Sequence, residues 1–370
     1  MNIMDLLPGV QALHWGQVVM MAVGGVLIYL AIAKEYEPVL LLPIGTGCLL
    51  ANLPLSALVG EEGLLTMLYR IGVRTEVFPL LIFLGVGAMM DFRPLLAQPK
   101  FALMGAAGQF GIFGTLMLAA LLGYNLNEAA SIGIIGAIDG PTSIYVSSLL
   151  APHLLGPIAV AAYSYMSLVP IIQPPIMRLM TTREERRIHI EYAPRPVSRL
   201  ALILFPLAVI LIVGILVPQA TPLVAMLMVG NLIKESGVVD RLSRSAQNEI
   251  INVATIFLGF AIGSTMTAES FLNLRTLGIL LLGLLAFVLD TAAGLAFGKV
   301  MCVLSGRRIN PLVGAAGISA FPMSGRLVQR IAQEEDFSNF ILMHAMGANT
   351  AGQLGSVIAG GVLLALFGAG

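Results

Sequence analysis

Charged side chains are scarce in this sequence. Only 11% of its 370 residues are Asp, Glu, Lys or Arg, whereas 58% are hydrophobic. A soluble domain carries about 25% charged residues, and a soluble fold would have no surface for so much apolar material. The sequence therefore predicts a protein embedded in a bilayer. Its 20 acidic and 20 basic residues balance, so there is no basic face of the kind that would indicate nucleic-acid binding.

Cysteine is almost absent as well. Cys48 and Cys302 lie far apart in apolar surroundings, and we expect them to be small core residues with no disulfide or metal role. The N-terminus lacks the charged region and cleavage site of a secretory signal, so we expect the first hydrophobic helix to direct insertion. The sequence also lacks a Ser-His-Asp arrangement, a nucleotide-binding loop and a metal-ligand cluster, which argues against a self-contained soluble active site.

Long apolar segments are plentiful. A membrane-spanning helix needs about 20 apolar residues, and six segments are predicted to span: Gly16–Ala33, Pro38–Val59, Phe101–Gly123, Gly156–Met177, Leu200–Pro218 and Thr276–Gly298. Other apolar segments are short or interrupted: Phe78–Met90, Ala129–Ile138 before Asp139-Gly140-Pro141, the Gly/Pro/Ser-rich Asn310–Ser324, and Met343–Gly355. Non-helical backbone at membrane depth is tolerated only where it is buried in protein or lines a wet cavity. We therefore expect the interrupted segments to contact an ion or a substrate.

An arginine-rich connector divides the chain. Residues 178–199 contain Arg178, Arg183, Arg186, Arg187, Arg195 and Arg199. The positive-inside rule places such a connector in the cytoplasm. The predicted organisation is thus an N-terminal transmembrane half (1–177), the connector (178–199) and a C-terminal half (200–370).

The two halves share sequence patterns. Pro43 and Asn52 in PIGTGCLLANL match Pro222 and Asn231 in PLVAMLMVGNL, IFLGVG matches IFLGFA, and GAIDGPTS matches GISAFPMS, all in the same order. If the Asp139 segment is re-entrant, five spans separate equivalent helices, and an odd number inverts the second copy. We therefore predict an all-α polytopic membrane protein with two inverted repeats, whose broken or re-entrant helices meet near the midplane as in secondary transporters.

Asp139 is the most informative residue. A charged acid at bilayer depth costs about 3 kcal/mol on insertion scales, so it needs a partner or a bound cation. Gly140-Pro141 would break the helix and free carbonyls, and Thr142 and Ser143 add hydroxyl oxygens. This set of oxygens suits a hard cation such as sodium. A proton is the rival occupant, and an ion pair with Arg326 is the structural alternative.

The second-half counterpart reads NPLVGAAGISAFPMSGR, from Asn310 to Arg326. Asn310, Ser319 and Ser324 offer neutral oxygens, and Gly314 allows close backbone approach. A helix-packing seam of small residues would account for the glycines, but not for two prolines and an arginine as well. We interpret the segment as the second side of the site.

Further polar residues occur in apolar segments. Tyr163 and Tyr165 are two residues apart on a helix and point to different faces, so at most one is expected to line the site. Asn349, beside Gly347 and Gly352, is a better candidate than His344. Asp290 is a second intramembrane acid, but no Gly-Pro break follows it, and we interpret it as a packing or cavity residue.

Four long motifs resemble those of a known family, the β-subunits of sodium-translocating biotin-dependent decarboxylases. They are IGIIGAIDGPTSIYVSSLLAP, AVAAYSYMSLVPIIQPPIMR, RINPLVGAAGISAFPMSGRLVQR and NFILMHAMGANTAGQLGS. The similarity runs from about Gly16 to the C-terminus.

The resemblance implies a function. In that family a carboxyltransferase α-subunit moves a carboxyl group onto biotin, and the β-subunit decarboxylates carboxybiotin, consumes a proton from the periplasmic side and exports Na⁺ across the bacterial cytoplasmic membrane. It implies a biotin carrier protein, a small single-span membrane subunit (γ or δ) and a homo-oligomer. The functional residues of the family fall on Asp139, Tyr165, Asn310, Gly314, Ser319, Arg326 and Asn349.

Within this resemblance, Asp139, Asn310, Gly314, Ser319 and Asn349 are predicted to hold Na⁺. Asp139, Tyr165 and Arg326 are predicted to be catalytic, and Arg326 to hold the carboxybiotin. The short link Leu55–Val77 points toward an acyl-CoA or malonate decarboxylase. The residues alone leave open a secondary transporter, either a sodium/carboxylate symporter or a cation antiporter, which would need no biotin.

Overall fold

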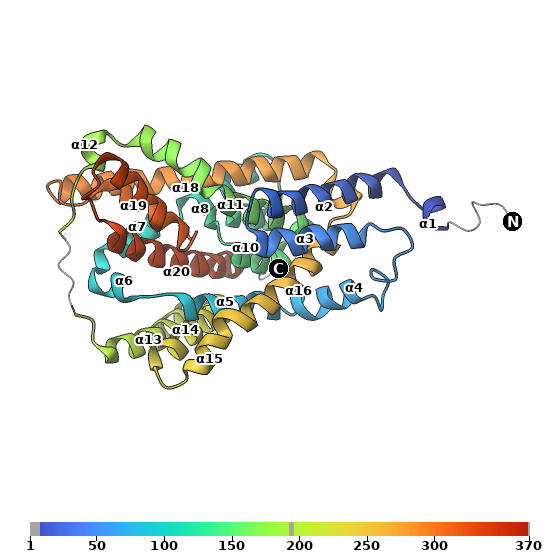
Figure 1. Cartoon of the computed structure of the whole chain (residues 1–370), viewed down its shortest axis with the longest axis horizontal. Helices are drawn as coiled ribbons and strands as arrows, with labels where there is room; N and C mark the ends of the chain where they lie inside the picture. Colours follow the sequence, from blue (N-terminus) through green and yellow to red (C-terminus); the bar gives the residue numbers. More distant parts are fainter. Residues whose placement is uncertain (1–7, 192–195, 369–370) are drawn as a thin grey trace.

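The computed structural model describes residues 8–191 and 196–368, and within these ranges the chain is helical and contains no strand (Figure 1). The helices of the first half are α1 (Pro8–Gln11), α2 (Trp15–Ala33), α3 (Pro38–Ala51), α4 (Leu64–Leu68), α5 (Val77–Met89), α6 (Arg93–Ala97), α7 (Ala102–Ala107), α8 (Phe110–Leu121), α9 (Leu126–Gly133), α10 (Gly140–Leu150) and α11 (Leu155–Met180). The connector contains α12 (Arg183–Arg186). The second half contains α13 (Arg199–Leu216), α14 (Thr221–Ser236), α15 (Asp240–Ser245), α16 (Ile251–Ser264), α17 (Ala268–Phe271), α18 (Leu274–Leu304), α19 (Met323–Glu335) and α20 (Leu342–Phe367).

Short helical turns of other kinds join these helices. Two are π-helical, η2 (Tyr69–Val73) and η7 (Ala246–Ile250). The 3₁₀ turns are η3 (Pro99–Phe101), η4 (Ile134–Ala137), η5 (Pro152–Leu154), η6 (Pro218–Ala220) and η8 (Pro311–Gly317).

Six helical segments of the described chain are long and apolar enough to cross a membrane: Trp15–Ala33, Pro99–Leu121, Pro152–Met180, Arg199–Leu216, Leu274–Leu304 and Leu342–Phe367. Five of them confirm predicted spans. The sixth corrects the prediction that Met343–Gly355 is broken, because α20 runs through it without interruption. Its polar side chains bond to neighbouring elements and leave the helical backbone intact.

The predicted span Pro38–Val59 is wrong at its C-terminal end. Helix α3 stops at Ala51, and Asn52 caps it, donating its side-chain N–H to the carbonyl of Cys48 at 2.8 Å. Pro54 follows two residues later and removes a backbone donor, so the helix cannot continue. The remaining residues up to Leu64 form turns.

The two halves cross over one another. Helix α3 packs on α16, and α14 packs on α5. The matched asparagines make equivalent bonds: Asn52 Nδ2 donates to Met266 O at 2.9 Å and Asn231 Nδ2 donates to Met90 O at 3.1 Å. The π-helical turns η2 and η7 precede α5 and α16 in the same way. These features agree with an internal repeat, whose inversion stays a prediction.

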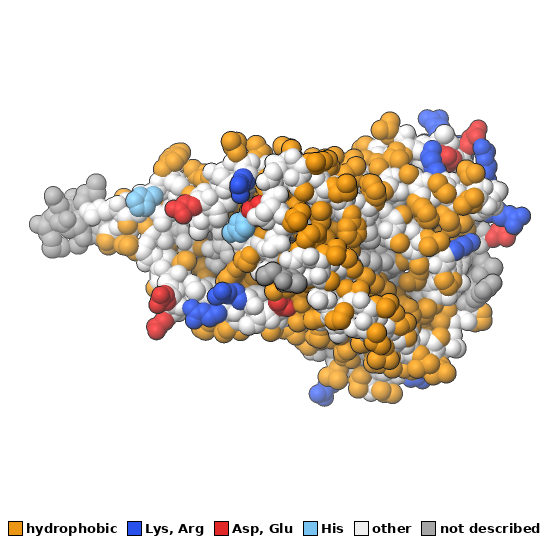
Figure 2. Space-filling model, turned by 180° about the vertical axis from the view of Figure 1, so that it is seen from behind, with side chains coloured by type: hydrophobic (Ala, Val, Ile, Leu, Met, Phe, Trp, Pro, Cys, Tyr) orange, Lys and Arg blue, Asp and Glu red, His pale blue; other side chains and the backbone are white. Residues whose placement is uncertain are grey.

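Charge is distributed as a membrane protein requires. Figure 2 shows hydrophobic side chains over the middle of the molecule and charged side chains gathered mostly toward its two ends. One of these ends carries α12, the helix of the arginine-rich connector (Figure 1). Arg195, which the sequence analysis includes in the same connector, lies outside the described residues.

Candidate functional site

The first broken segment is built as the sequence predicts. Helix α9 gives way to the 3₁₀ turn η4, Ile138 adopts a left-handed conformation with φ 54°, and Asp139 is extended with φ −130° and ψ 102°. Helix α10 then starts at Gly140, with Pro141 in its first turn, where a missing N–H is harmless. Asp139 therefore sits at a break in the helical backbone.

The second broken segment has a similar form. The 3₁₀ turn η8 ends at Gly317, Ile318 is extended with φ −77° and ψ 159°, and α19 starts at Met323. Ser319 and Phe321 therefore occupy non-helical backbone, as Asp139 does in the first half.

Both breaks face one cavity of about 530 Å³. The first break contributes Asp139 and Pro141, and the second contributes Ser319, Phe321 and Pro322. Residues of α3, α5, α11, α16, α19 and α20, together with the acids Glu37 and Asp91, complete the walls. The prediction that the two broken segments share a site agrees with this arrangement.

Asp139 is held by hydrogen-bond donors from two helices. Its side chain is buried at 6% exposure, and its Oδ2 accepts bonds from Thr142 Oγ1 at 2.5 Å and from Gln353 Nε2 at 2.8 Å. No ion pair joins Asp139 to Arg326 or to any other described basic residue. The structural alternative of a paired acid is therefore wrong in this structure, and the carboxylate has only neutral donors.

Gln353 is the residue that the sequence analysis undervalued. The sequence analysis does not name it among the candidate site residues. The available signal was its spacing: Asn349 and Gln353 are four residues apart, which places them on one face of a continuous helix. The sequence analysis expects this segment to be broken, and a broken segment does not place the two residues on one helix face.

Asn349 lies beside the second break. Its Nδ2 donates to Ile318 O at 2.6 Å, while its Oδ1 is buried and accepts no hydrogen bond from any described group. Two turns further along α20, Ser356 bonds to Ser319 Oγ and donates to Gln109 Oε1 at 2.8 Å. This face of α20 connects both breaks and leaves one amide oxygen without a partner.

The two tyrosines point to different elements, as their spacing predicts. Tyr163 lines the cavity, and its buried hydroxyl has no hydrogen-bond partner within the described ranges. The hydroxyl of Tyr165 donates to Leu280 O on α18 and is not among the cavity-lining groups. The structure thus brings Tyr163 to Asp139, whereas the catalytic role predicted for Tyr165 stays a prediction.

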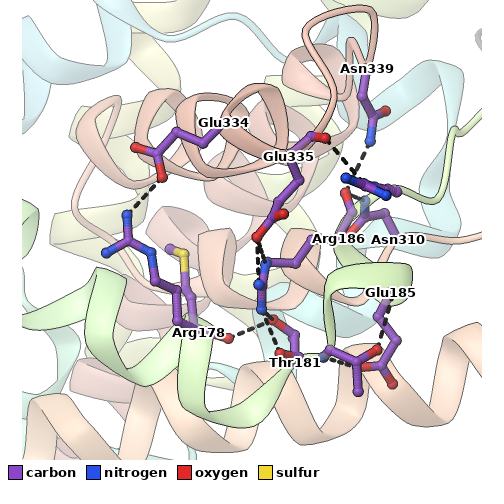
Figure 3. A network of polar contacts seen from close by, with 11 residues as sticks. Arg178, Thr181, Glu185, Arg186, Asn310, Glu334, Glu335 and Asn339 are labelled. Carbon is purple, nitrogen blue, oxygen red and sulfur yellow. Dashed lines mark hydrogen bonds and ion pairs between the residues drawn. The ribbon is translucent and has the colours of Figure 1, made fainter.

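Asn310 lies away from the cavity. Its Nδ2 donates to the carbonyls of Arg186 and Ile188, each at 2.9 Å, and its Oδ1 accepts a bond from Leu312 N–H at 3.0 Å. These bonds use the whole amide to attach the connector to the second half (Figure 3). As an ion ligand Asn310 stays a prediction, but the structure gives its side chain other partners.

Gly314 is also a packing contact in this structure. A Cβ at this position would lie 1.9 Å from the carbonyl oxygen of Gly294, so only glycine lets η8 lie against α18. Arg326, in contrast, reaches the cavity wall while its side chain remains exposed. Of the predicted residues, the structure gathers Asp139, Ser319, Arg326 and Asn349 around the breaks and places Tyr165, Asn310 and Gly314 elsewhere.

Comparison with known proteins decides the family. The profile of the family described as "Na+-transporting oxaloacetate decarboxylase beta subunit" matches residues 16–367. The chain belongs to this family. It is accordingly a multi-pass membrane subunit of a multi-subunit, Na⁺-transporting decarboxylase, which confirms the resemblance.

The decarboxylase β-subunits that are similar to this chain include both acyl-CoA and oxaloacetate types. It is 52% identical to the glutaconyl-CoA decarboxylase subunit beta of Acidaminococcus fermentans, covering 97% of this chain and 96% of that one. It is 53% identical to the methylmalonyl-CoA decarboxylase subunit beta of Veillonella parvula, over 97% and 95% of the two chains. Identity to the oxaloacetate decarboxylase beta chain of Klebsiella pneumoniae is 46%, over 96% of each chain.

The connector of this β-subunit is fixed to its second half by ion pairs. Arg186, with a side chain only 7% exposed, donates to Glu335 Oε1 through Nε at 2.9 Å and Nη2 at 2.5 Å. Arg178 pairs with Glu334 at 2.7 Å (Figure 3). Glu335 ends α19, which begins just after the second break. The pKa of the Glu335 carboxyl is lowered, chiefly by the hydrogen bond from Arg186.

Proposed function

We propose that this subunit couples the decarboxylation of carboxybiotin to Na⁺ export across the bacterial cytoplasmic membrane, with one proton consumed per decarboxylation. The carboxybiotin is carried on a separate biotin carrier protein, and a carboxyltransferase α-subunit loads it. A small single-span subunit and further copies of this chain complete the assembly. The family match supports the pump, and the cavity at the two breaks supports the position of the ion.

The position of Asp139 carries the proposal. It is a buried acid at the floor of a cavity, it has no basic partner in the described chain, and two neutral donors orient it. A carboxylate in this setting is stabilised when a cation binds. Na⁺ is the cation that one carboxylate and several neutral oxygens suit.

Neutral oxygens are available on the opposite side of the cavity. Ser319 is one of its lining residues, and Asn349, which is bonded to Ile318 O beside the second break, has a buried Oδ1 without a donor in the described chain. A buried amide oxygen without a hydrogen bond is costly unless an ion or water satisfies it. We infer that Na⁺ binds between Asp139 and this second-half pair.

Arg326 is suited to binding carboxybiotin. Its guanidinium is exposed at the wall of the same cavity, and the described chain gives it no acidic partner. Guanidinium binds planar carboxylates through two parallel hydrogen bonds. We infer that Arg326 holds the carboxylate of carboxybiotin, which loses CO₂ and takes a proton on its ring nitrogen to give biotin.

Competition at Asp139 would provide the coupling. One carboxylate cannot be neutralised by Na⁺ and by a proton at the same time. A proton that reaches Asp139, relayed by a tyrosine beside it, would release Na⁺ to the outer side. The same proton would then pass to the biotin nitrogen and leave Asp139 ionised for the next Na⁺. The position of Tyr163 in the cavity lining supports such a role for Tyr163, and the family resemblance supports it for Tyr165.

An acyl-CoA is the substrate class that the comparisons favour. Identity to the two acyl-CoA decarboxylase relatives is 52% and 53%, against 46% for the oxaloacetate chain of K. pneumoniae. The alignment with that oxaloacetate chain extends over 417 positions, more than the 370 residues here, so it includes insertions that this chain lacks. The alignment with the glutaconyl-CoA relative takes 360 positions.

The proposal is tested in two steps. An avidin column should retain this chain in a complex with a biotinylated protein, and a secondary transporter would not be retained. In proteoliposomes with the purified complex, Asp139→Asn should abolish ²²Na⁺ uptake and carboxybiotin decarboxylation together, whereas Cys302→Ser should leave both unchanged. Persistent Na⁺ uptake by Asp139→Asn would refute the proposed ion site.

A further inference from the structure

A second buried acid lies outside the cavity. Asp290 is near the middle of α18 and has no exposed surface. Its Oδ1 accepts a hydrogen bond from the backbone N–H of Gly111 on α8 at 2.5 Å, and its Oδ2 has no partner in the described chain. No described lysine, arginine or histidine forms an ion pair with it. A carboxylate so placed needs a bound cation or proton.

The packing at Asp290 favours a proton over a metal ion. A Cβ at Gly111 would lie 2.5 Å from Asp290 Oδ1 and 2.6 Å from Ala286 O, so α8 lies flush against the acid. The nearest group is an N–H donor, which repels a metal cation. Sodium needs several oxygen ligands, whereas a proton needs only the carboxylate oxygen itself.

Unpartnered hydroxyls lie in the same bundle of helices. Helix α8 packs against both α9 and α18. Ser131 on α9, Thr115 on α8 and Thr291 on α18 are fully buried, and their hydroxyls make no hydrogen bond within the described residues. Buried polar atoms without a partner indicate unobserved water or an ion. Four such atoms, counting Asp290 Oδ2, belong to these three packed helices.

A cluster of titratable groups closes the end of this bundle that is remote from the connector. Glu128 at the start of α9 accepts bonds through Oε1 from His153 at 3.0 Å and from Arg275 at 3.3 Å. The hydroxyl of Tyr124 donates to the carbonyl of Arg275 at 3.1 Å. Glu128 and Ser131 are three residues apart and share one face of α9. Arg275 and Asp290 are on α18, about 22 Å apart along the helix axis.

We propose that the bundle of α8, α9 and α18 carries the proton that the pump consumes, that the Glu128–His153–Arg275 cluster admits it, and that Asp290 is its buried binding site. This inference rests on the proposed function, which requires a proton from the side remote from the connector. Histidine suits the entry because one of its ring nitrogens can accept a proton while the other donates one. The other titratable groups that face the path are Tyr124, beside the cluster, and Tyr165, which α11 packs against α18.

Contacts connect Asp290 to the first break. The N–H of Gly111 is bonded to Asp290, and a Cβ at Gly136 would lie 2.9 Å from the carbonyl carbon of Gly111. Gly136 belongs to η4, which leads directly to Asp139. The backbone of α8 therefore contacts both Asp290 and the η4 turn. A change in the charge of Asp290 changes the strength of its hydrogen bond to the Gly111 N–H. It therefore also changes how firmly α8 packs against the η4 turn.

The experiment uses the intact complex in two forms. A protonated carboxylic acid gives an infrared carbonyl band that neither a carboxylate nor an amide gives at the same position. We expect Asp290→Asn to remove such a band, and Cys302→Ser on the same helix to retain it. In proteoliposomes with a lumenal pH dye and the connector side outward, we expect Asp290→Asn to slow substrate-driven lumenal alkalinisation by about a hundredfold, the scale of a lost general acid–base group.

The outcomes are separable. A spectrum that is unchanged in Asp290→Asn would overturn the assignment of Asp290 as a proton site. Loss of the band with wild-type alkalinisation would overturn the pathway, because the acid would then only pack α8 on α18. Ser131→Ala, a smaller change, should slow alkalinisation without removing the band, and unaltered alkalinisation would count against the path. If the wild-type complex itself moves no Na⁺, the proposed function fails, whereas the infrared result still decides the state of Asp290.

Discussion

The amide of Gln353 donates a hydrogen bond of 2.8 Å to the carboxylate of Asp139, 214 residues away in the chain. It fastens the middle of α20 to the break before α10 and holds one oxygen of the acid in a fixed direction. A hydrogen bond to a charged group contributes about 1.5–3 kcal/mol. The position of the proposed ion ligand therefore depends on the C-terminal helix as much as on its own segment.

Gln353→Leu should weaken Na⁺ activation. The substitution keeps the volume but removes the donor that orients Asp139, and a loss of about 1.5–3 kcal/mol corresponds to roughly tenfold to a hundredfold in apparent affinity. The Na⁺ concentration for half-maximal decarboxylation by the purified complex measures this. Gln247→Leu, whose amide bonds to Ser243 away from the cavity, is the matched control. Equal Na⁺ dependence in the two variants would contradict the role of Gln353.

Gly140→Ala should disrupt the first break. The added Cβ would lie 1.9 Å from Cε1 of Tyr163, and this ring is fully buried and cannot move aside. Overpacking of this kind costs about 1–3 kcal/mol and displaces neighbouring backbone. We expect a lower melting temperature and a loss of Na⁺ transport. Gly25→Ala is the control, because nothing lies within 4 Å of its added Cβ.

Tyr163→Phe should reduce activity, whereas Tyr165→Phe should reduce stability. The hydroxyl of Tyr163 has no partner in the described chain, so its removal should leave the melting temperature nearly unchanged and reduce decarboxylation. The hydroxyl of Tyr165 bonds to Leu280 O, and its removal should cost about 1 kcal/mol of stability. Melting curves and turnover of both variants provide the comparison. The reverse pattern would return the proton role to Tyr165.

Arg186→Met should loosen the connector. It leaves Glu335 half-buried without its partner, and breaking a buried pair from one side costs about 3–5 kcal/mol. A lowered melting temperature and faster trypsin cleavage within residues 183–191 are the expected results. Arg241→Met removes an exposed arginine from α15 and should change neither the melting temperature nor the rate of trypsin cleavage.

The loop after α19 should give the connector an acid-dependent stability. Hydrogen bonds from Ser338 and His189 lower the pKa of Asp336 from 3.8 to about 2. A carboxyl whose folded pKa is lowered stabilises the fold above its unfolded pKa, and this contribution is lost as the pH falls through the folded value. The melting temperature of the native chain should therefore exceed that of Asp336→Asn above pH 3.8, and the difference should vanish near pH 2. If the difference in melting temperature between the two chains stays the same from pH 3.8 to pH 2, Asp336 is not the source of the acid dependence.

The sequence predicted what depends on local chemistry. Hydropathy located five of the six spans, and Gly140-Pro141 located the break at Asp139, because proline and glycine act on their own segment of backbone. It could not predict partners that the tertiary fold supplies. Nothing local to Asn310 shows that Arg186 and Ile188 present carbonyls to it, and the same holds for the choice between Tyr163 and Tyr165. The continuity of α20 was missed because its polar residues are satisfied by distant segments.

The crosswise contacts of the two halves have a consequence for biogenesis. Helix α3 packs on α16 of the second half, and α5 packs on α14 and α16, so each half leaves an apolar helix face and an asparagine donor without these contacts until the other half is inserted. When only the first half has been synthesised, it is therefore not yet a stable unit. The first half therefore stays incompletely packed in the bilayer. The fold is completed when α14 and α16 insert and pack on it, and not when each helix enters the membrane.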